Sequence, residues 1–233
     1  MPRPERKKQS SRKNRPKLPV IPQSKPNSFL ITGIALVALS VIVLLSIFYP
    51  VLKAELAYLF SGNKNTQVVG KSEAMVPVGG NAQNIEIMKP VDENFGIVIP
   101  KIQANAKVIP DVDAQNPAVY QKALAQGVAH ALGSANPGEE GNVFIFAHSG
   151  QDFLEANRYN AVFYLLSKLE AGEEIYIFYK SKKYRYIITD KKTANPEEIQ
   201  YLADTPGKNI LTLMTCWPGG TTWKRLIVRA QQK

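Results

Sequence analysis

An uninterrupted apolar run near the amino terminus is the strongest pattern of hydrophobic positions in the chain. It reads FLITGIALVALSVIVLLSIF from Phe29 to Phe48, and no charged residue lies between Lys25 and Lys53. Twenty helical residues at about 1.5 Å each span about 30 Å, the thickness of a bilayer's hydrocarbon core. A core helix would carry a polar stripe, and a cleaved signal peptide would have a shorter apolar region and a small-residue cleavage site. The pattern therefore predicts an uncleaved transmembrane helix over residues 29–49.

A stretch without aromatic residues follows the apolar run. Residues 61–94 contain no Phe, Tyr or Trp and include four glycines. Such a composition buries little apolar surface, which is typical of a linker. We therefore expect a juxtamembrane segment and linker over residues 50–94, in which residues 49–60 extend the helix out of the membrane. A folded domain is expected over residues 95–233.

The remainder of the chain alternates short β-rich runs with turn residues. Many short strands of this kind indicate a β-barrel or a β-sandwich. One short helix is expected around Ala161–Leu169, and another from Pro196 with Asn195 as its N-cap. The fold class is therefore all-β with one or two short helices, in a domain long enough to bury a core. The expected strands are residues 95–102, 106–110, 142–148, 174–179, 183–189, 209–216 and 224–230.

Positive charge is concentrated at the amino terminus. The chain has a formal net charge of +10, and residues 1–28 hold nine basic side chains against the single acid Glu5. A basic protein can bind nucleic acid, but here the excess lies in a Pro/Ser-rich tail beside an apolar helix. The positive-inside rule assigns such a tail to the cytoplasm. We therefore expect a single-pass membrane protein with a basic cytoplasmic tail, an extracellular folded domain and no nucleic-acid partner.

Few side chains in this sequence can bind a metal or form a disulfide. Cys216 is the only cysteine, and His130 and His148 are the only histidines. A single cysteine excludes an intrachain disulfide and a cysteine-based structural zinc site, and no acidic cluster for calcium accompanies it. We therefore expect no metal and no cofactor. A lone cysteine is usually a small buried hydrophobe, but an unpaired one outside the cell is a candidate reactive thiol.

The ends of three predicted strands carry candidate catalytic groups. The run ending at Cys216 is separated by seven residues, WPGGTTW, from a run starting at Lys224. If these two strands pair as a hairpin, Cys216 and Arg225 lie near the same rim. His148 ends the apolar run NVFIFAH. An imidazole activates a nearby thiol, and a guanidinium can stabilise an oxyanion, although spacing alone makes this triple a weak signal.

Four segments of the chain resemble the sortase family. TLMTC (212–216) with the downstream Arg225 resembles the family's TLxTC motif and its arginine. NVFIFAHSG resembles the family's histidine segment, with Ala147 in place of the usual glycine. FGIVIPKIQANAKVIP (95–110) and ALAQGVAHALGSANPGEEGN (123–142) resemble the opening strands and the Gly-rich stretch that follows them. The matches occur in family order and cover nearly the whole expected domain, which makes the resemblance specific.

The resemblance implies an eight-stranded β-barrel and a cysteine transpeptidase with the catalytic set His148, Cys216 and Arg225. The Cys216 thiolate would attack the carbonyl after the threonine of an LPXTG-like C-terminal sorting signal and form a thioacyl-enzyme. Arg225 would hold the substrate and the oxyanion, while His148 would protonate the leaving amine. The implied partners are proteins with such signals, the membrane, and an amine acceptor such as a cell-wall precursor or another protein's lysine.

Three further residues are candidates for substrate binding, each with a structural alternative. Thr215 contacts substrate or packs as an ordinary strand residue. Trp217 lines a groove for the sorting signal or caps the barrel end. His130 resembles a histidine that lies near the site in some sortase groups, although a lone histidine is commonly structural.

Two alternative functions remain open at this point. Pilin-polymerising sortases often carry a second membrane helix and a lid with an Asp-Pro-aromatic motif, and residues 61–94 contain no such motif. We therefore expect a housekeeping or class D/E-like sortase that attaches proteins to the cell surface. The other alternative is a non-catalytic anchored barrel that binds extended peptides, but such a module has no need of a thiol.

Overall fold

The structure consists of an amino-terminal helix and a β-barrel. The computed structural model describes residues 28–61, 66–70, 86–149, 162–198, 200–201 and 205–233. The chain as far as Val43 and the chain from Leu44 onward form separate compact units. The predicted basic tail lies outside the described residues, apart from Ser28.

Helix α1 spans Ser28–Ser61. Its first 19 residues, Ser28–Ser46, are long and apolar enough to cross a bilayer. Large apolar side chains are exposed along this part, including Phe29 and Leu45. A helix that is apolar all round requires a non-aqueous environment, so this one fits a single-pass membrane anchor. The predicted continuation of the helix through residues 49–60 is confirmed.

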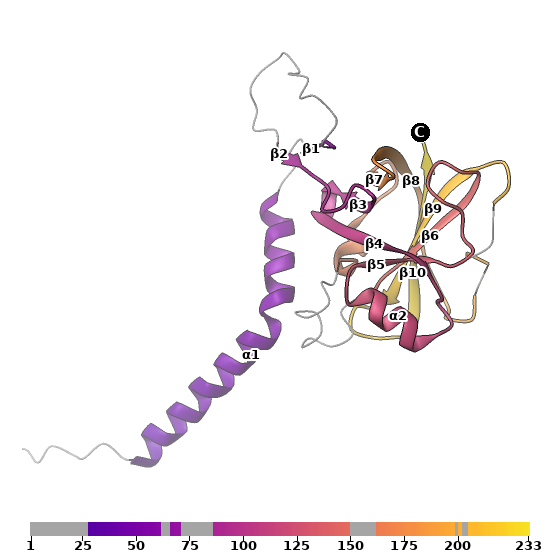
Figure 1. The fold of residues 1–233 in the computed structure, drawn as a ribbon. Coiled ribbons are helices and arrows are strands. Elements are labelled where there is room, and N and C mark those ends of the chain that lie inside the picture. The colour runs from indigo at the N-terminus through magenta and orange to yellow at the C-terminus, as the bar shows by residue number, and fades with distance from the viewer. Residues whose placement is uncertain (1–27, 62–65, 71–85, 150–161, 199, 202–204) are drawn as a thin grey trace, which may run out of the picture. The chain divides into compact units, whose positions relative to one another are not determined.

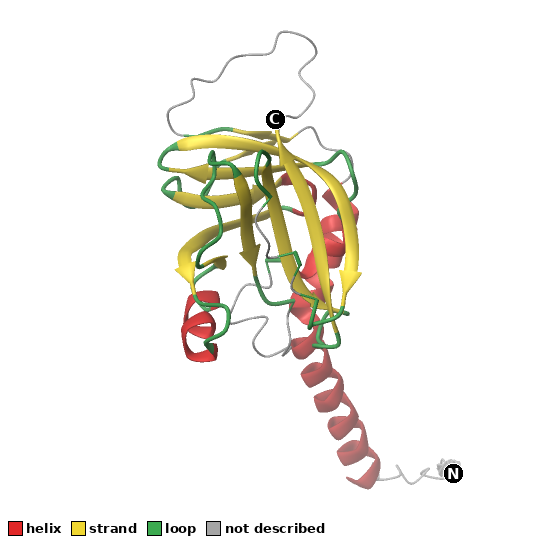
Figure 2. Cartoon of the chain, turned by 90° about the vertical axis from the view of Figure 1, so that its right-hand side faces the viewer, coloured by secondary structure: helices red, strands yellow, loops and turns green. Residues whose placement is uncertain are grey.

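Eight strands close into a barrel in the order β10-β8-β7-β3-β4-β5-β6-β9 (Figure 1). Most neighbours are antiparallel, whereas β4–β5 and β6–β9 are parallel. Figure 2 shows the strands curving around a common interior. The eight-stranded barrel implied by the sequence is confirmed. The strands are β3 Phe95–Ile99, β4 Ala104–Val112, β5 Val128–Ala131, β6 Gly141–Phe146, β7 Glu174–Tyr179, β8 Lys182–Ala194, β9 Asn209–Trp217 and β10 Lys224–Gln232.

Alternate residues of the strands form the core inside the barrel. Because side chains along a strand point to opposite faces in turn, every second apolar residue faces inward. On β9 the inward residues include Leu211 and Leu213, which have no exposed surface. Met214 and Cys216 belong to the alternate set of positions on the outer face of the barrel, and both are only partly buried. The strand that fills the core therefore also presents the cysteine outside it.

Part of the expected linker packs on the barrel. Strands β1 (Thr66–Val68) and β2 (Glu86–Met88) form a two-stranded parallel sheet. Val68 packs with Val98 and Phe178, on the outer faces of β3 and β7. Two short strands therefore lie within the segment expected to be a linker, because a few apolar side chains suffice for such a contact. Residues 71–85 between the strands lie outside the described residues.

The helices differ from those expected. Helix α2 (Pro117–Leu124) was not predicted, whereas the helix expected around Ala161–Leu169 is the short 3-10 helix η2 (Tyr164–Lys168) in its described part. A second 3-10 helix, η1 (Pro100–Ile102), ends the first predicted strand early, because Pro100 has no N–H for a ladder. The described residues between 196 and 201 form turns or irregular backbone instead of the helix expected there.

Candidate active site

The end of β6 lies beside the end of β9, and this brings His148 toward Cys216. The two strands run parallel with Phe146 opposite Met214, and the Ala147 N–H donates to the Met214 carbonyl oxygen over 3.1 Å. His148 and Cys216 each follow this pair by two residues. Adjacent strands lie about 4.8 Å apart, so the imidazole and the thiol emerge at neighbouring positions of one barrel rim.

The hairpin of β9 and β10 places Arg225 on the other side of Cys216. The strands pair antiparallel, with Arg225 directly opposite Cys216. The predicted hairpin is therefore confirmed. Directly opposed residues share one face of a sheet, with Cβ atoms about 4.5–5.5 Å apart. His148, Cys216 and Arg225 thus lie in one row across the ends of three neighbouring strands.

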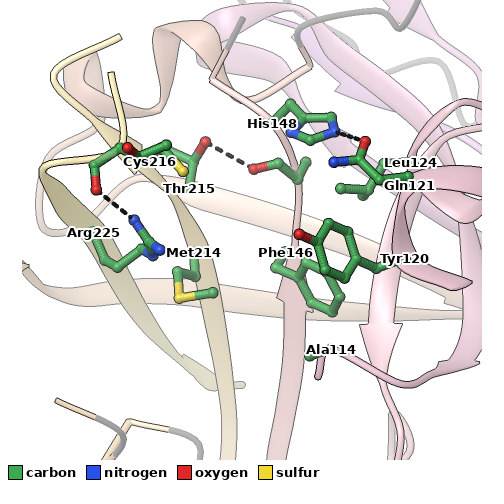
Figure 3. A pocket seen from close by; sticks show the side chains of 12 residues that line it. Ala114, Tyr120, Gln121, Leu124, Phe146, His148, Met214, Thr215, Cys216 and Arg225 are labelled. Atoms are coloured by element: carbon green, nitrogen blue, oxygen red, sulfur yellow. Dashed lines mark hydrogen bonds between the residues drawn. The ribbon is translucent and has the colours of Figure 1, made fainter. Parts of the chain in front are cut away.

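A cavity of about 200 Å³ opens beside this row. Phe146, Met214 and Leu124 make part of its wall apolar, and the described lining residues include no carboxylate. Across the described part of the chain, no group of three or more His, Cys, Asp or Glu side chains could hold a metal ion. The walls come from three places: α2 with Tyr120, Gln121 and Leu124, the end of β6 with Phe146 and His148, and the hairpin with Met214, Cys216 and Arg225 (Figure 3).

Cys216 is a free, partly buried thiol at the cavity wall. Burial raises its pKa above the usual range, because a thiolate loses hydration there. The nearby Arg225 guanidinium acts in the opposite direction and lowers the pKa, but the net shift is upward. The thiol is therefore protonated at neutral pH in this arrangement. Formation of the nucleophilic thiolate requires a base that accepts its proton.

Arg225 is held by its own loop. Its Nη1 donates to the carbonyl oxygens of Thr222 at 3.1 Å and Lys224 at 3.2 Å. It forms no ion pair with an acid among the residues that the structure describes, so it does not act there as a rim salt bridge. A guanidinium has five N–H donors. Within the described residues the donors on Nε and Nη2 have no hydrogen-bond partner, so they are available to a ligand carbonyl or an oxyanion in the cavity.

His148 contacts helix α2 on the side away from the hairpin. Its Nε2 lies 3.1 Å from the Gln121 Oε1 atom, within hydrogen-bond distance. Figure 3 shows His148 with Gln121 on one side and Cys216 on the other. The imidazole is partly exposed and lines the cavity. It is therefore both accessible and oriented by a side chain from another element.

Thr215 and Trp217, the sequence neighbours of Cys216, differ in their access to the cavity. Thr215 lines the cavity, but it is buried and its hydroxyl donates to the Ala147 carbonyl oxygen over 2.9 Å. This bond ties β9 to the residue before His148 and so helps to fix the row. Trp217 is half-buried, packs against the core and is not among the cavity-lining residues. Substrate contact by either side chain stays a prediction.

The structure does not bring His130 to the cavity. The side chain lies in β5, has 0% exposure and packs near the Phe95 ring. Its Nε2 lies 3.0 Å from the Ala135 carbonyl oxygen and 2.8 Å from the Ser134 Oγ. Because a carbonyl only accepts, Nε2 carries the proton. A side chain without exposed surface cannot touch a ligand, so this placement favours the structural alternative over the predicted substrate contact.

Sequence reasoning missed the whole α2 wall of the cavity. Asn116 caps this helix by accepting from the Ala118 N–H over 3.1 Å, and Pro117 occupies its first turn. Ala123 and Leu124 bury its other end in the core. The signal in the sequence that could have revealed this helix is the Asn-Pro pair, followed seven residues later by two apolar residues. Nothing in the sequence connects Gln121 with His148, which lies 27 positions away.

The barrel matches a known family domain. The model of the sortase domain matches residues 97–233. A sortase A of Streptococcus agalactiae serotype III (strain NEM316) is 25% identical over 179 residues, which are 77% of this chain and 64% of that protein. The chain thus spans slightly less than two thirds of that relative's length.

Solved sortase structures resemble the fold as well. Sortase A from Corynebacterium diphtheriae is 30% identical with a TM-score of 0.52, over 61% of each chain. A sortase D5 transpeptidase from Clostridium perfringens is 25% identical with a TM-score of 0.50, over 61% of this chain and 79% of that one. Sortase C-1 from Actinomyces oris is 26% identical with a TM-score of 0.51, over 61% and 75%. Since the sortase domain occupies more than half of the sequence and forms the closed barrel described above, this chain belongs to the sortase family.

Proposed function

We propose that this chain is a membrane-anchored cysteine transpeptidase that cleaves an LPXTG-like sorting signal and transfers the protein to an amine acceptor at the cell surface. The observation that carries the proposal is the row of His148, Cys216 and Arg225 at one cavity. The three side chains supply a proton acceptor, a nucleophile and a cluster of hydrogen-bond donors. Sortases are transpeptidases, and these are the groups that acyl transfer through a thioester requires.

The first half-reaction forms a thioester. The Cys216 proton passes to His148, and the sulfur attacks the carbonyl carbon of the residue at the scissile bond. Arg225 donates hydrogen bonds to the oxygen that becomes negative in the tetrahedral intermediate. His148 then gives its proton to the leaving amine as the C–N bond breaks. The upward shift of the thiol pKa makes the step depend on His148, because little thiolate exists without a base.

The second half-reaction transfers the acyl group. An incoming amine loses a proton to His148 and attacks the thioester carbonyl, and the C–S bond breaks to regenerate the Cys216 thiol. The energy of the original peptide bond is retained in the thioester, so no nucleotide is consumed. The absence of an Asp-Pro-aromatic motif in residues 61–94 supports surface attachment over pilin polymerisation.

A peptide screen tests the proposed function. The full chain in detergent is incubated with a set of LPXTG-like peptides, and its intact mass is measured with and without a small amine acceptor. We expect a mass increase equal to the acyl fragment on Cys216, and release of an amide product when the amine is added. Peptide binding without a covalent adduct and without cleavage would instead support a non-catalytic binding barrel.

Substitution of Arg225 tests its part in the reaction. We expect Arg225→Ala to lower kcat about 10²–10³-fold, as for loss of an oxyanion donor, and Arg225→Lys to be less severe because charge is kept. Because Arg225 lowers the pKa of Cys216, its removal raises that pKa further, and alkylation of the thiol moves to higher pH. Rates of iodoacetamide labelling against pH measure this shift.

Arg229→Ala is the matched control for Arg225, because it removes the same charge from the same strand farther from Cys216. We expect this control to retain the turnover and the alkylation profile of the parent chain. An Arg225→Ala variant with full turnover and a lowered melting temperature would remove Arg225 from the site.

The orientation in the membrane is tested with single-cysteine chains. In a Cys216→Ala background, one cysteine replaces Ser24 in the tail and another replaces Lys233 after the barrel. If the basic tail is cytoplasmic, an impermeant maleimide added to intact cells labels position 233 and leaves position 24 unlabelled. Lysis before labelling exposes both positions and serves as the control. The reverse labelling pattern would invert the assigned topology.

A further inference from the structure

Helix α2 is a firmly held support for the side chains that it presents to the cavity. The Asn116 side chain caps its first turn, Pro117 fixes the backbone there, and Ala123 and Leu124 are buried in the core. Tyr120 and Gln121 therefore occupy defined positions at the cavity wall. A side chain on a fixed helix can hold a neighbouring group more accurately than one on a loop.

Gln121 uses this position to contact the imidazole of His148. Its Oε1 lies 3.1 Å from the His148 Nε2 (Figure 3). No carboxylate is present among the described cavity-lining residues, and the side chain that meets His148 from α2 is an uncharged amide. An amide oxygen accepts hydrogen bonds and does not titrate near neutral pH.

The contact determines which ring nitrogen exchanges protons. An amide oxygen can only accept, so the hydrogen bond keeps a proton on Nε2 and leaves Nδ1 as the nitrogen that gains and loses one. The same bond persists in the neutral imidazole and in the imidazolium, since Nε2 carries a proton in both. The ring therefore keeps its orientation while the proton passes between the thiol, the ring and the leaving amine. Cys-His-Asn sites in papain-like proteases show that an amide can be the third member of such a group.

We propose that Gln121 is a positioning residue for the transpeptidation reaction, which orients His148 and fixes its protonated nitrogen through the Oε1–Nε2 hydrogen bond. This inference rests on the proposed function of the His148, Cys216 and Arg225 row. It extends that row by a fourth residue from α2, an element on the side of His148 opposite the hairpin. The site is then a row of side chains that runs from Gln121 on α2 past His148 and Cys216 to Arg225.

Three variants of the full chain in detergent test the proposal. Gln121→Ala removes the acceptor, Gln121→Glu keeps an acceptor and adds a negative charge, and Lys122→Ala alters the neighbouring exposed residue outside the cavity. We expect Gln121→Ala to lower kcat about 10- to 100-fold with little change in KM, as for a misplaced catalytic group. Gln121→Glu restores most of the lost rate at its own pH optimum. Lys122→Ala retains the parent values.

The pH profile separates orientation from a purely structural role. A carboxylate beside the imidazole stabilises its charged form, so Gln121→Glu raises the pKa of His148 and shifts the imidazole limb of the kcat/KM profile to higher pH. Selective ¹⁵N-histidine labelling checks the same point without turnover, because the chain contains only His130 and His148. We expect the His148 spectrum of the parent chain to show the Nε2-protonated form, and that of Gln121→Ala to show a mixture.

Several outcomes would overturn the inference. Gln121→Ala with parent kcat and an unchanged His148 spectrum would show that the contact does not orient the ring. A lower melting temperature of Gln121→Ala with normal turnover of the folded chain would give Gln121 a structural role only. Failure of the proposed function gives a different result: the parent chain forms no acyl-enzyme, and its lone thiol is not needed for cleavage. The His148 spectrum does not depend on turnover, so it then still shows whether Gln121 fixes the protonated nitrogen of the ring.

Discussion

Replacement of Cys216 by alanine is expected to abolish sorting-signal cleavage, with a loss of at least about 10⁴-fold in kcat. The sulfur is the only atom of the site that can form the thioester, and the chain has no second cysteine to replace it. The substitution removes one partly buried atom, so stability changes little, within about 1 kcal/mol. Peptide cleavage and the intact mass of the chain are measured under identical conditions. We expect the acyl adduct and the product to disappear together.

Two comparisons make the Cys216 result decisive. Cys216→Ser keeps the side-chain shape but offers a much weaker nucleophile, so it should bind the peptide and still fail to turn over. The melting temperatures of both variants report whether the barrel is intact. Normal cleavage by folded Cys216→Ala would refute the thioacyl mechanism.

Replacement of His148 by alanine is expected to lower kcat about 10²–10⁴-fold, the usual loss for a missing general acid–base. The structural reason is the raised pKa of Cys216, which leaves the thiol protonated unless a neighbouring base takes its proton. In the proposed reaction the leaving amine also needs a proton, which His148 would supply. Initial rates across a range of pH measure the loss. Imidazole added to the buffer is expected to restore part of the rate, because the partly open cavity admits it.

His130→Ala provides the contrast for His148. His130 is fully buried and bonded to Ser134 and Ala135, so its removal leaves polar atoms without a partner and creates a void. We expect a destabilisation of about 1–3 kcal/mol with normal turnover of the folded fraction. Equal loss of activity in both histidine variants, at unchanged stability, would contradict this division of roles.

The two neighbours of β9 explain why the site lies where it does. The parallel neighbour β6 ends at the same rim as β9, and the antiparallel neighbour β10 starts there. The end of β9 thus has an imidazole on one side and a guanidinium on the other. The Thr215 hydroxyl bonded to the Ala147 carbonyl oxygen joins β9 to the residue before His148. Thr215 therefore supports the arrangement of the row, in addition to any contact with substrate.

The sequence by itself determined the elements whose patterns are local. The apolar run of α1 is recognisable because it must match the thickness of a bilayer. Strands such as β7 and β9 are recognisable because each is a short run rich in apolar and aromatic residues. The β9–β10 hairpin was predictable because the connecting loop is short and rich in Pro and Gly. The order of the motifs indicated the family, and the family implied the barrel.

Only the tertiary structure decided the features that depend on contacts between distant segments. Strand β5 has four residues and α2 has eight, so their local patterns are too short to identify them. The burial of His130 depends on Phe95 and on the turn after β5, and the packing of β1 and β2 depends on the outer faces of β3 and β7. The turn follows β5 directly, but Phe95 is far from His130 in sequence, and Phe178 is far from Val68.

The active-site row shows the same division at the level of single residues. The pairing of Cys216 with Arg225 followed from one hairpin, whose register a short loop restricts. The approach of His148 required the parallel pairing of β6 with β9, which no local pattern encodes because parallel strands are joined through long connections. The bond between Gln121 and His148 required in addition the position of α2 on the barrel. The sequence thus identified the candidate residues, and the closure of the barrel determined how they lie relative to one another.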